Sequence, residues 1–469
     1  MREDWEEILY KDAVFKIPTS KQKLKQKEYS QFGEFPVVDQ GKEIIGGYSN
    51  DSERILDCKL PVVVFGDHSK CVKLINFKFV PGADGTKVLE PKSNINPKFI
   101  SYLTHVLIHK IKDKGYARHY QYIEKENLPL APLPEQRYIV AKIEELFSDL
   151  DKGIADLKKA QDQLKVYRHA VLKKAFEGEL TKDWRVINSY TMHDFLENLK
   201  VEKQTAIKEK LISKGEYFPK YVSKDLTYKV PENWITLPWK TLGANNKYAM
   251  KRGPFGSALK KEFFVEKGVV VYEQGHAIND EPYRHRYYIT NEKFKELKAF
   301  ETKPGDMIIS CSGVTLGRIC LLPDDADVGV INQALLKLDM DESIMLKPYF
   351  IQLFRSGSFQ RLIFQKSLGS AMPNMVGMAE LKEIPIPIPP IEEQHQILKE
   401  IESRLSVCDK VEESITESLE KAKALRQSIL KKAFEGTLLS EEEIAACKAA
   451  PDYEPASVLL KKIKAEKKK

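Results

Sequence analysis

Apolar residues recur at steps of three and four along two long stretches of the chain, 139–171 and 397–429. Lys, Glu and Asp fill the positions between them, so each stretch predicts an amphipathic helix with one apolar seam. A seam sustained over about 35 residues is typical of a coiled coil. Pro134 and Pro390 stand where each helix is expected to begin, and Gly178 and Gly436 where each is expected to end.

The two predicted helices are copies of one another. Residues 136–180 and 394–438 align without a gap, with 17 of 45 positions identical, including the block KKAFEG. A duplicated helix suggests two equivalent docking surfaces for a partner. Neither helix can bury its seam alone, so we expect the two to pair with each other. An antiparallel pair would place one globular domain at each end, about a pseudo-twofold axis, whereas the alternative parallel pair would not.

Each helix follows a globular stretch rich in short β-branched and aromatic runs, broken by Gly and Pro. The expected fold class is therefore α+β, with two mixed, strand-rich domains separated by an antiparallel coiled coil of two long repeated helices. The expected segments are a first domain (1–132), a first long helix (133–180), a helical or charged linker (181–229), a second domain (230–388), a second long helix (389–440) and a charged C-terminal tail (441–469).

Composition agrees with a soluble protein of several domains. The chain has 469 residues, of which 42% are hydrophobic and 30% charged. No run of 18 apolar residues occurs and the N-terminus lacks the apolar core of a signal peptide, so we expect a cytoplasmic location and no membrane contact. The six cysteines show no CxxC pair. A net charge of +7 is compatible with nucleic acid without being diagnostic of it.

Motifs for catalysis are missing from the sequence. It contains no GxxxxGK[ST] for a nucleoside triphosphate, no GxGxxG for a dinucleotide and no [DNS]PP[YFW] of amino-methyltransferases. His105 and His109 have helical i, i+4 spacing but no third metal ligand beside them. A nuclease-like PD…ExK pattern at 451–468 lies in a polar tail without a strand to hold its carboxylates. We therefore expect no catalytic residue, no metal site and no cofactor bound by this chain.

Basic residues interleaved with aromatic ones occur in both globular stretches. Arg and Lys neutralise phosphates and read guanine edges, and Gly and Ser beside them let the backbone approach a duplex. Ordinary solvated charges are the alternative for each residue, but clustering on both domains favours DNA binding. The candidate DNA-binding residues are Lys42, His68, Lys70, Tyr116, Arg118 and His119 in the first domain, and Lys251, Arg252, Ser257, Lys260, Arg284, His285 and Arg286 in the second.

These features together resemble the specificity subunit of type I restriction–modification enzymes. The resemblance covers nearly the whole chain and is carried by FPVVDQGKEIIGGYSN (35–50), GPFGSALKKEFF (253–264) and IPIPPIEEQHQILKEI (386–401). A proline-rich segment followed by Glu-Gln, at 135–136 and again at 393–394, is a specific signal of that family. One departure is that the first module starts abruptly, with Trp5 four residues from the N-terminus, whereas the second has the full lead-in PENWITLPW (231–239).

The resemblance implies that the chain reads a bipartite double-stranded DNA target and catalyses nothing itself. It implies that two methyltransferase subunits, which use S-adenosylmethionine, dock on the repeated helices. Two motor–nuclease restriction subunits, which use ATP and Mg²⁺, would join them. The residues expected at the docking surfaces are Glu135, Gln136, Phe176, Glu393, Gln394 and Phe434.

Two other functions compete with this reading. A self-sufficient DNA methyltransferase or nuclease would need a cofactor pocket or clustered carboxylates that the motifs do not reveal. A coiled-coil scaffold that reads no DNA would leave the basic segments of both domains unexplained.

Overall fold

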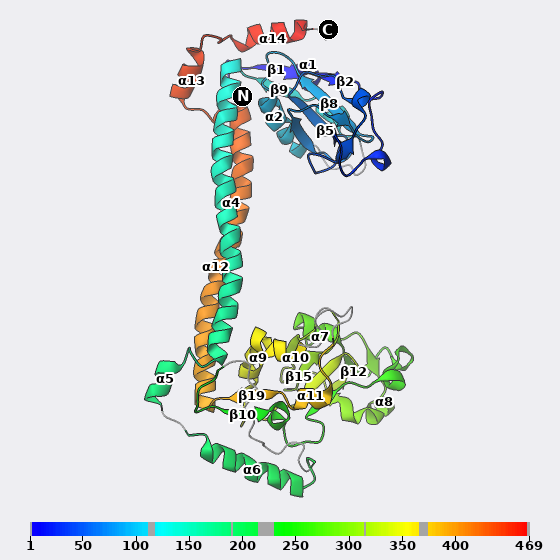
Figure 1. Cartoon of the computed structure of the whole chain (residues 1–469), viewed down its shortest axis with the longest axis vertical. Helices are drawn as coiled ribbons and strands as arrows, with labels where there is room; N and C mark the ends of the chain where they lie inside the picture. The colour runs from blue at the N-terminus through cyan, green and yellow to red at the C-terminus, as the bar shows by residue number, and fades with distance from the viewer. Residues whose placement is uncertain are drawn as a thin grey trace. The chain divides into compact units, whose positions relative to one another are not determined.

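A computed structural model describes residues 2–110, 118–188, 191–213, 229–313, 316–364 and 374–466. The chain divides into two compact units, which are treated separately below. Unit 1 comprises Met1–Lys159 and Ile415–Lys469, and unit 2 comprises Ala160–Ser414. Both long helices pass from one unit to the other (Figure 1).

The N-terminal domain of unit 1 is built from short strands with buried β-branched and aromatic side chains. Its elements are β1 (Glu6–Leu9), α1 (Tyr10–Ala13), β2 (Val14–Ile17), β3 (Phe35–Val38), β4 (Gly47–Ser49), β5 (Val62–Gly66), β6 (Val72–Ile75), β7 (Val80–Pro81), β8 (Thr86–Pro91), α2 (Pro97–Lys110), α3 (Tyr120–Ile123) and β9 (Asn127–Leu130). One sheet has the antiparallel order β2-β8-β5-β6, and a second has the order β4-β3-β7 with β3 and β7 parallel. Strand β1 pairs with β9 just before the first long helix.

The domain of unit 2 repeats this topology. Its elements are β10 (Ile235–Pro238), β11 (Met250–Arg252), β12 (Val269–Tyr272), α7 (Gln274–Asn279), β13 (Tyr288–Ile289), α8 (Asn291–Glu296), β14 (Glu301–Thr302), β15 (Met307–Ser310), β16 (Ile319–Leu321), β17 (Gly329–Ile331), β18 (Leu335–Leu338), α9 (Lys347–Arg355), α10 (Gly357–Phe364), α11 (Met378–Lys382) and β19 (Pro385–Ile388). The sheet order β11-β18-β15-β16 matches β2-β8-β5-β6, and the parallel pair β12·β17 matches β3·β7. The duplication therefore extends beyond the helices, although the sequence reveals it clearly only there.

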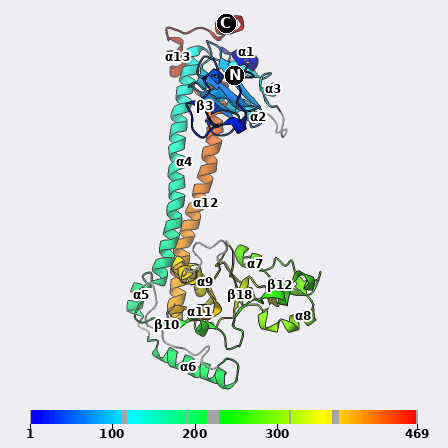
Figure 2. The same cartoon turned by 45° about the vertical axis from the view of Figure 1, so that its right-hand side comes forward.

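The two repeated helices are α4 (Leu133–Phe176) and α12 (Ile391–Glu435), and they pack against each other in an antiparallel pair (Figure 2). In unit 1 the start of α4 meets the end of α12, so that Ile139 and Ile143 share a core with Ile429. In unit 2 the end of α4 meets the start of α12, where Ala175 shares a core with Ile397. The predicted fold class, including the antiparallel coiled coil, is confirmed.

Equivalent ion pairs join the two helices in each unit. Arg168 Nη2 lies 2.6 Å from Asp409 Oδ1 in unit 2, and Arg426 forms an ion pair with Asp151 in unit 1. These four residues occupy matching positions of the sequence repeat. Exposed pairs of this kind contribute ~0.2–1 kcal/mol each, so their main effect is on register and orientation rather than on stability.

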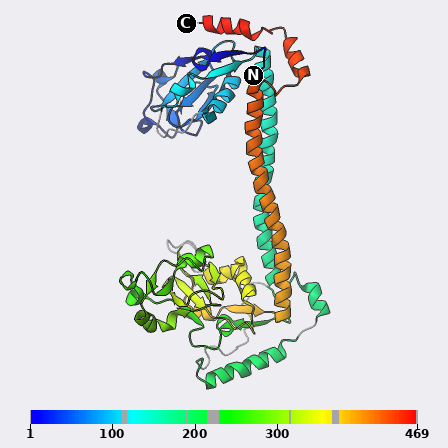
Figure 3. The ribbon, with the colours of Figure 1, turned by 180° about the vertical axis from the view of Figure 1, so that it is seen from behind.

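The segments expected to be a linker and a charged tail contain packed helices. In unit 1, α13 (Glu441–Lys448) and α14 (Ala456–Ala465) bury Cys447, Leu459 and Ile463 in the core of the N-terminal domain. In unit 2, α5 (Lys182–Ile187) and α6 (His193–Lys208) follow α4, and the buried Lys203 Nζ donates to Gly243 O at 3.1 Å (Figure 3). Both segments return to the domain that their own unit contains.

No helix in the part of the chain that the structure describes combines the length and the apolar character needed to cross a membrane.

Asp306 is a buried carboxylate in unit 2 whose ionisation opposes folding. Its side chain is 0% exposed, and only Oδ2 accepts hydrogen bonds, from Thr302 Oγ1 at 3.1 Å and Lys303 N at 3.0 Å. Burial, and then the nearby Asp339 carboxylate, raise the pKa of Asp306 to about 6. The folded state therefore holds this proton more tightly than the unfolded chain does.

We expect the stability of the Asp306→Asn variant, compared with that of the wild type, to increase as pH rises. Since the folded pKa exceeds the unfolded value, the wild type loses stability at this group between about pH 4 and pH 6, by about 3 kcal/mol. The free energy of unfolding of Asp306→Asn relative to wild type should rise by that amount from pH 4 to pH 7. Urea unfolding of both proteins at the two pH values measures the difference, and an unchanged difference would contradict this account of Asp306.

Candidate nucleic-acid interface

Three loops of unit 1 meet where the parallel strands β3 and β7 end. Because the carboxyl ends of parallel strands lie at one edge of a sheet, residues 39–46 and 82–86 are neighbours, and the turn 66–71 after β5 joins them. The His68 backbone N–H donates to Gln40 Oε1 at 3.3 Å, and Ser69 Oγ donates to Gln40 O at 2.5 Å. We call residues 39–46, 66–71, 82–86 and 118–120 the unit 1 loop cluster.

The unit 1 loop cluster brings together several of the predicted DNA-binding residues. Lys42 and Arg118 are exposed, and His68 and Lys70 are half-buried in the turn after β5. Their arrangement presents cationic and polar side chains from loops that are far apart in the sequence. Tyr116 lies outside the described residues.

His119 is a correction to the predicted set, because its side chain is 0% exposed. Its backbone N–H donates to Asp67 O at 2.9 Å, and its ring Nδ1 lies at the same distance from that oxygen. The Tyr120 backbone N–H donates to Asp67 Oδ1 at 2.8 Å, and Lys87 Nζ lies 3.3 Å from Asp67 Oδ2. His119 therefore fixes the segment that carries Arg118 and does not reach a ligand at the surface.

Unit 2 has a loop cluster at the equivalent edge of its sheets. Residues after β12, β15 and β17 meet there, as those after β3, β5 and β7 do in unit 1. Gln274 Nε2 donates to Ser312 O, which joins the loop after β12 to the loop after β15. Arg286 joins the same cluster through Glu273, with its Nε donating to Glu273 Oε1 at 2.6 Å. We call residues 252–256, 273–286, 310–313 and 332–334 the unit 2 loop cluster.

The basic residues predicted in unit 2 are held in different ways. Arg284 is exposed and lies 3.3 Å from Glu281, and Lys260 is exposed and lies 3.6 Å from Glu262. Lys251 and Arg252 are half-buried on β11, each with its cationic group above an aromatic ring. The side chain of Ser257 lies outside the described part of the chain.

His285 is held by internal contacts and is a weaker candidate than its arginine neighbours. Its Nε2 lies 3.2 Å from Pro282 O, and its Nδ1 lies 3.4 Å from Asp327 Oδ2. Its ring packs edge-on against Tyr272 with 5.7 Å between centroids. These contacts hold the segment between α7 and β13 that presents Arg284 and Arg286.

A repeated acid-Gln-Gly triplet, not singled out from the sequence, organises both loop clusters. Asp39-Gln40-Gly41 follows β3 and Glu273-Gln274-Gly275 follows β12. Gln40 bonds to the loop after β5, and Gln274 bonds to the loop after β15. The sequence shows the same triplet after two valine-rich strands. A search for basic residues does not find it, because its glutamine is uncharged.

The residues predicted to dock a partner lie instead at buried junctions between helix and domain. Glu135 is 0% exposed; Trp5 Nε1 donates to its Oε2 at 2.9 Å and Arg2 Nη1 lies 3.0 Å from the same oxygen. Glu393 is equally buried; Trp234 Nε1 donates to it at 2.9 Å and Arg185 forms an ion pair with it. Each carboxylate lies in the first turn of its long helix.

Gln136 and Gln394 complete the two junctions with matching hydrogen bonds. Gln136 accepts from Asn96 N at 2.8 Å and donates to Ala131 O at 2.8 Å. Gln394 accepts from Leu346 N at 2.8 Å and donates to Pro389 O at 3.0 Å. Both amides therefore tie a long helix to the start of the domain helix and to the proline-rich segment before it.

The two phenylalanines of the predicted docking set are also buried. Phe434 meets Phe99 edge-on at 5.2 Å between centroids, and Phe176 meets Tyr349 edge-on at 5.4 Å. Five of the six side chains are at most 1% exposed and Phe434 is 8% exposed, so the structure gives these residues a role inside the fold and corrects their placement on a docking surface. They hold each domain on its pair of helices.

The two arginines at the junctions come from different places in the chain. The Arg2 Cζ lies 5.6 Å from the Trp5 ring, and the Arg185 Cζ lies 5.9 Å from the Trp234 ring. Arg2 stands three residues before its tryptophan, whereas Arg185 comes from α5, which follows α4. Residues of α13 and α14 also share the core of the first domain with Trp5.

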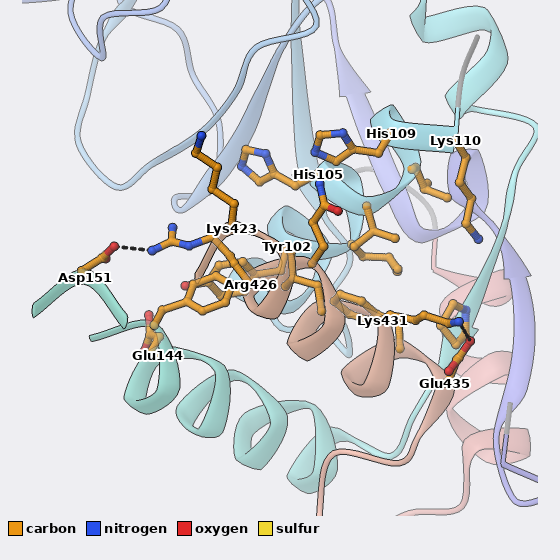
Figure 4. A pocket seen from close by; sticks show the side chains of 18 of the residues that line it. Tyr102, His105, His109, Lys110, Glu144, Asp151, Lys423, Arg426, Lys431 and Glu435 are labelled. Atoms are coloured by element: carbon orange, nitrogen blue, oxygen red, sulfur yellow. Dashed lines mark hydrogen bonds and ion pairs between the residues drawn. The ribbon is translucent and has the colours of Figure 1, made fainter. Parts of the chain in front are cut away.

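A groove of about 1380 Å³ in unit 1 runs between α2 and the paired α4 and α12 (Figure 4). Apolar side chains such as Phe147 and Leu430 line it, together with His105, His109 and Lys110 of α2 and the ion pair of Arg426 with Asp151. The groove therefore combines an apolar lining with charged side chains of both signs, among them Glu144, Lys423 and Glu435.

Comparison with known proteins identifies the family. A family model described as the type I restriction modification DNA specificity domain matches residues 2–159 and 185–421. The chain therefore belongs to this family of type I restriction–modification specificity proteins. The predicted family, that of type I specificity subunits, is confirmed.

Individual relatives have low sequence identity to this chain but match most of its length. The EcoBI specificity subunit of Escherichia coli is 26% identical over 344 residues, which cover 72% of this chain and 64% of that protein. The EcoDI specificity subunit of the same species is 25% identical over 429 residues, covering 87% and 84%. This chain thus spans slightly less than two thirds of the EcoBI subunit.

Two solved structures share the fold. The crystal structure of the HsdS subunit from Thermoanaerobacter tengcongensis has a TM-score of 0.53 at 16% identity, covering 93% of this chain and 98% of that one. A chain from a study of type I R-M complex assembly and conformational transition has a TM-score of 0.61 at 17% identity, covering 93% and 99%.

We expect Glu393→Ala to destabilise unit 2 by about 3–5 kcal/mol, because removing one partner of a buried pair leaves the others unsatisfied. Arg185 and the Trp234 N–H would lose their acceptor. Glu392→Ala, at the exposed neighbouring position, is the matched control and should change stability by less than about 0.5 kcal/mol. Chemical unfolding followed by tryptophan fluorescence measures both, and equal effects of the two substitutions would contradict the junction's role.

Proposed function

We propose that the chain reads a bipartite duplex DNA target, with the unit 1 loop cluster reading one half and the unit 2 loop cluster reading the other. The observation that carries this proposal is the recurrence of one loop arrangement, at the same edge of equivalent sheets, with exposed cations in both units. Lys42 and Arg118 display positive charge in unit 1, and Arg284 and Arg286 do so in unit 2.

The chemistry of these loops suits a polyanionic, base-edged ligand. Exposed Lys and Arg side chains neutralise phosphates, and an Arg fork also matches the O6 and N7 acceptors of guanine. Glutamine next to them matches adenine, although Gln40 and Gln274 already bond within their loops. Loops held by internal hydrogen bonds lose less conformational entropy on binding than mobile ones.

We further propose that two methyltransferase subunits dock on the paired helices. The support is a set of identical residues that the fold leaves partly or fully exposed. In unit 1 they are Ser148, Asp151, Lys152, Lys423, Arg426 and Lys431, and their counterparts in unit 2 are Ser406, Asp409, Lys410, Lys165, Arg168 and Lys173. The interhelical ion pairs account for the identical arginines and aspartates. Core packing does not require identity at the other exposed positions, so a repeated contact with the same partner explains those better.

The groove in unit 1 fits this docking proposal, since Asp151, Arg426 and Lys431 lie along it. Restriction subunits are proposed as further partners of the same complex. S-adenosylmethionine, ATP and Mg²⁺ are proposed to be bound by those partners, and this chain is proposed to bind no cofactor.

The division of labour between the units predicts that Arg118→Ala and Arg284→Ala affect different halves of the target. If each arginine forks a guanine, its loss should cost ~1–3 kcal/mol and relax preference in one half only. If it contacts a phosphate, affinity should fall for all sequences alike. Binding of the assembled methyltransferase complex to a panel of half-site variants, at several salt concentrations, separates these results.

Arg137→Ala is the matched control, because Arg137 is an exposed arginine of unit 1 that lies on α4, outside the unit 1 loop cluster, and pairs with Asp452. It should leave affinity and preference unchanged. Relaxation of the same half-site by both Arg118→Ala and Arg284→Ala would overturn the proposed division.

A further inference from the structure

A lysine-rich loop in unit 1 stands outside the residues considered so far. Between β2 and β3 the chain reads Lys-Gln-Lys-Leu-Lys-Gln-Lys at 21–27, with four lysines and no acidic residue. We call this segment the lysine arm. Lys21, Lys25 and Lys27 are exposed.

The backbone of the lysine arm is held in place at its centre. Leu24 is 5% exposed and its backbone N–H donates to Pro81 O, at the end of β7, at 2.9 Å. Arg54 Nη1 donates to Lys23 O at 2.8 Å, and Lys23 Nζ donates to Asp84 Oδ1 at 2.6 Å. The arm therefore presents its other lysines from a fixed backbone rather than from a free loop.

The anchored arm lies beside the unit 1 loop cluster. Asp84 belongs to that cluster, and the hydrogen bond from Lys23 together with the charges of Lys23, Lys25 and Arg118 lowers the pKa of its carboxyl. One exposed carboxylate thus lies among cations from the lysine arm and from the Arg118 segment. The arm extends the cationic surface of the cluster.

Unit 2 carries a basic loop at the equivalent place. Residues 253–264 follow β11 as the arm follows β2, and Gly253 N donates to Leu335 O at 2.9 Å. A side chain at Gly253 would collide with Asn332 O, which comes directly after β17. The start of this loop therefore lies against the end of β17, as Leu24 of the lysine arm lies against the end of β7. This second loop carries the exposed Lys260 and Lys261.

The two loops share position and charge but not sequence, since KQKLKQK has no counterpart in GPFGSALKK. A positive charge kept at one topological position, on loops of unrelated sequence, indicates a common ligand that is negative in both units. The backbone of duplex DNA is such a ligand, because it is the same whatever bases each unit reads.

We propose that the lysine arm grips backbone phosphates of the DNA half bound by unit 1, through Lys21, Lys25 and Lys27. This inference rests on the proposed DNA-reading function and adds to it a contact that is independent of base sequence. Lys23 is assigned a positioning role, because its ammonium is already bound to Asp84.

The test is the triple variant Lys21→Gln, Lys25→Gln, Lys27→Gln of the full chain, assembled with its methyltransferase partner. Each lost phosphate contact should reduce the slope of log affinity against log salt by ~0.9, hence by about 2.7 for three. Affinity should fall on the order of tenfold to a hundredfold near 0.15 M salt, equally for target and non-target duplexes. Discrimination between them should stay unchanged.

The matched control replaces Lys11, Lys125 and Lys461 by Gln, which removes the same charge from exposed positions elsewhere in unit 1. Its salt slope should stay within about one unit of wild type. A double variant, Lys25→Gln with Lys27→Gln, should show about two thirds of the triple variant's change in slope. This graded response separates lost contacts from misfolding, which would abolish binding without grading it.

The outcomes distinguish this inference from the function on which it rests. If the wild-type complex shows no preference for any duplex sequence, the proposed function fails. If the wild type discriminates but the triple variant keeps its salt slope, only the arm inference fails. A change in discrimination, or loss of the methyltransferase with DNA affinity retained, would likewise overturn the phosphate assignment.

Discussion

A buried carboxylate at the start of each long helix is the interaction on which the rest of the structure depends. Taking Glu135 or Glu393 out of water costs several kcal/mol unless other groups replace the lost hydration. A tryptophan N–H and an arginine do so in each unit, and the positive end of the helix dipole adds to them. Because all these groups must be present together, the junction fixes one arrangement of helix and domain.

This junction explains why the two halves of the chain share their helices and strand order but differ in their loops. Helices, junctions and strand order repeat, since they build the frame. The loops at the ends of the parallel strands do not repeat in sequence, apart from the acid-Gln-Gly triplet. A constant frame with variable loops is the arrangement expected of a protein whose two halves read different sequences while contacting identical partners.

Sequence periodicity predicted the helical pair well, because a coiled coil is defined by local spacing. The apolar seams predicted from Ile139 and from Ile397 are confirmed over most of their length. Val411 and Leu425, in the second seam, are exposed at 42% and 50%. Packing of α13 and α14 onto the N-terminal domain could not be predicted in the same way. It depends on contacts between the two ends of the chain, and a charged composition conceals the few apolar residues that make them.

The site residues were harder to predict for a physical reason. A repeated Glu-Gln pair has the same appearance whether it bonds inside the fold or at a surface, and only the positions of Trp5 and Trp234 decide between the two. His119 was misassigned because its acceptor, Asp67, lies 52 residues away in sequence. The lysine arm is not predicted by a pattern of basic residues beside aromatic ones, because the arm itself contains no aromatic residue. Its charge density is nevertheless higher than that of the segments around Arg118 and Arg284.

The chain contains two equivalent units, and each is proposed to engage one methyltransferase subunit and one half of the target. Native mass spectrometry of the chain with a saturating excess of its methyltransferase subunit tests this most directly. The account predicts one copy of this chain with two copies of the methyltransferase. A complex that remains at one to one under saturation would contradict it.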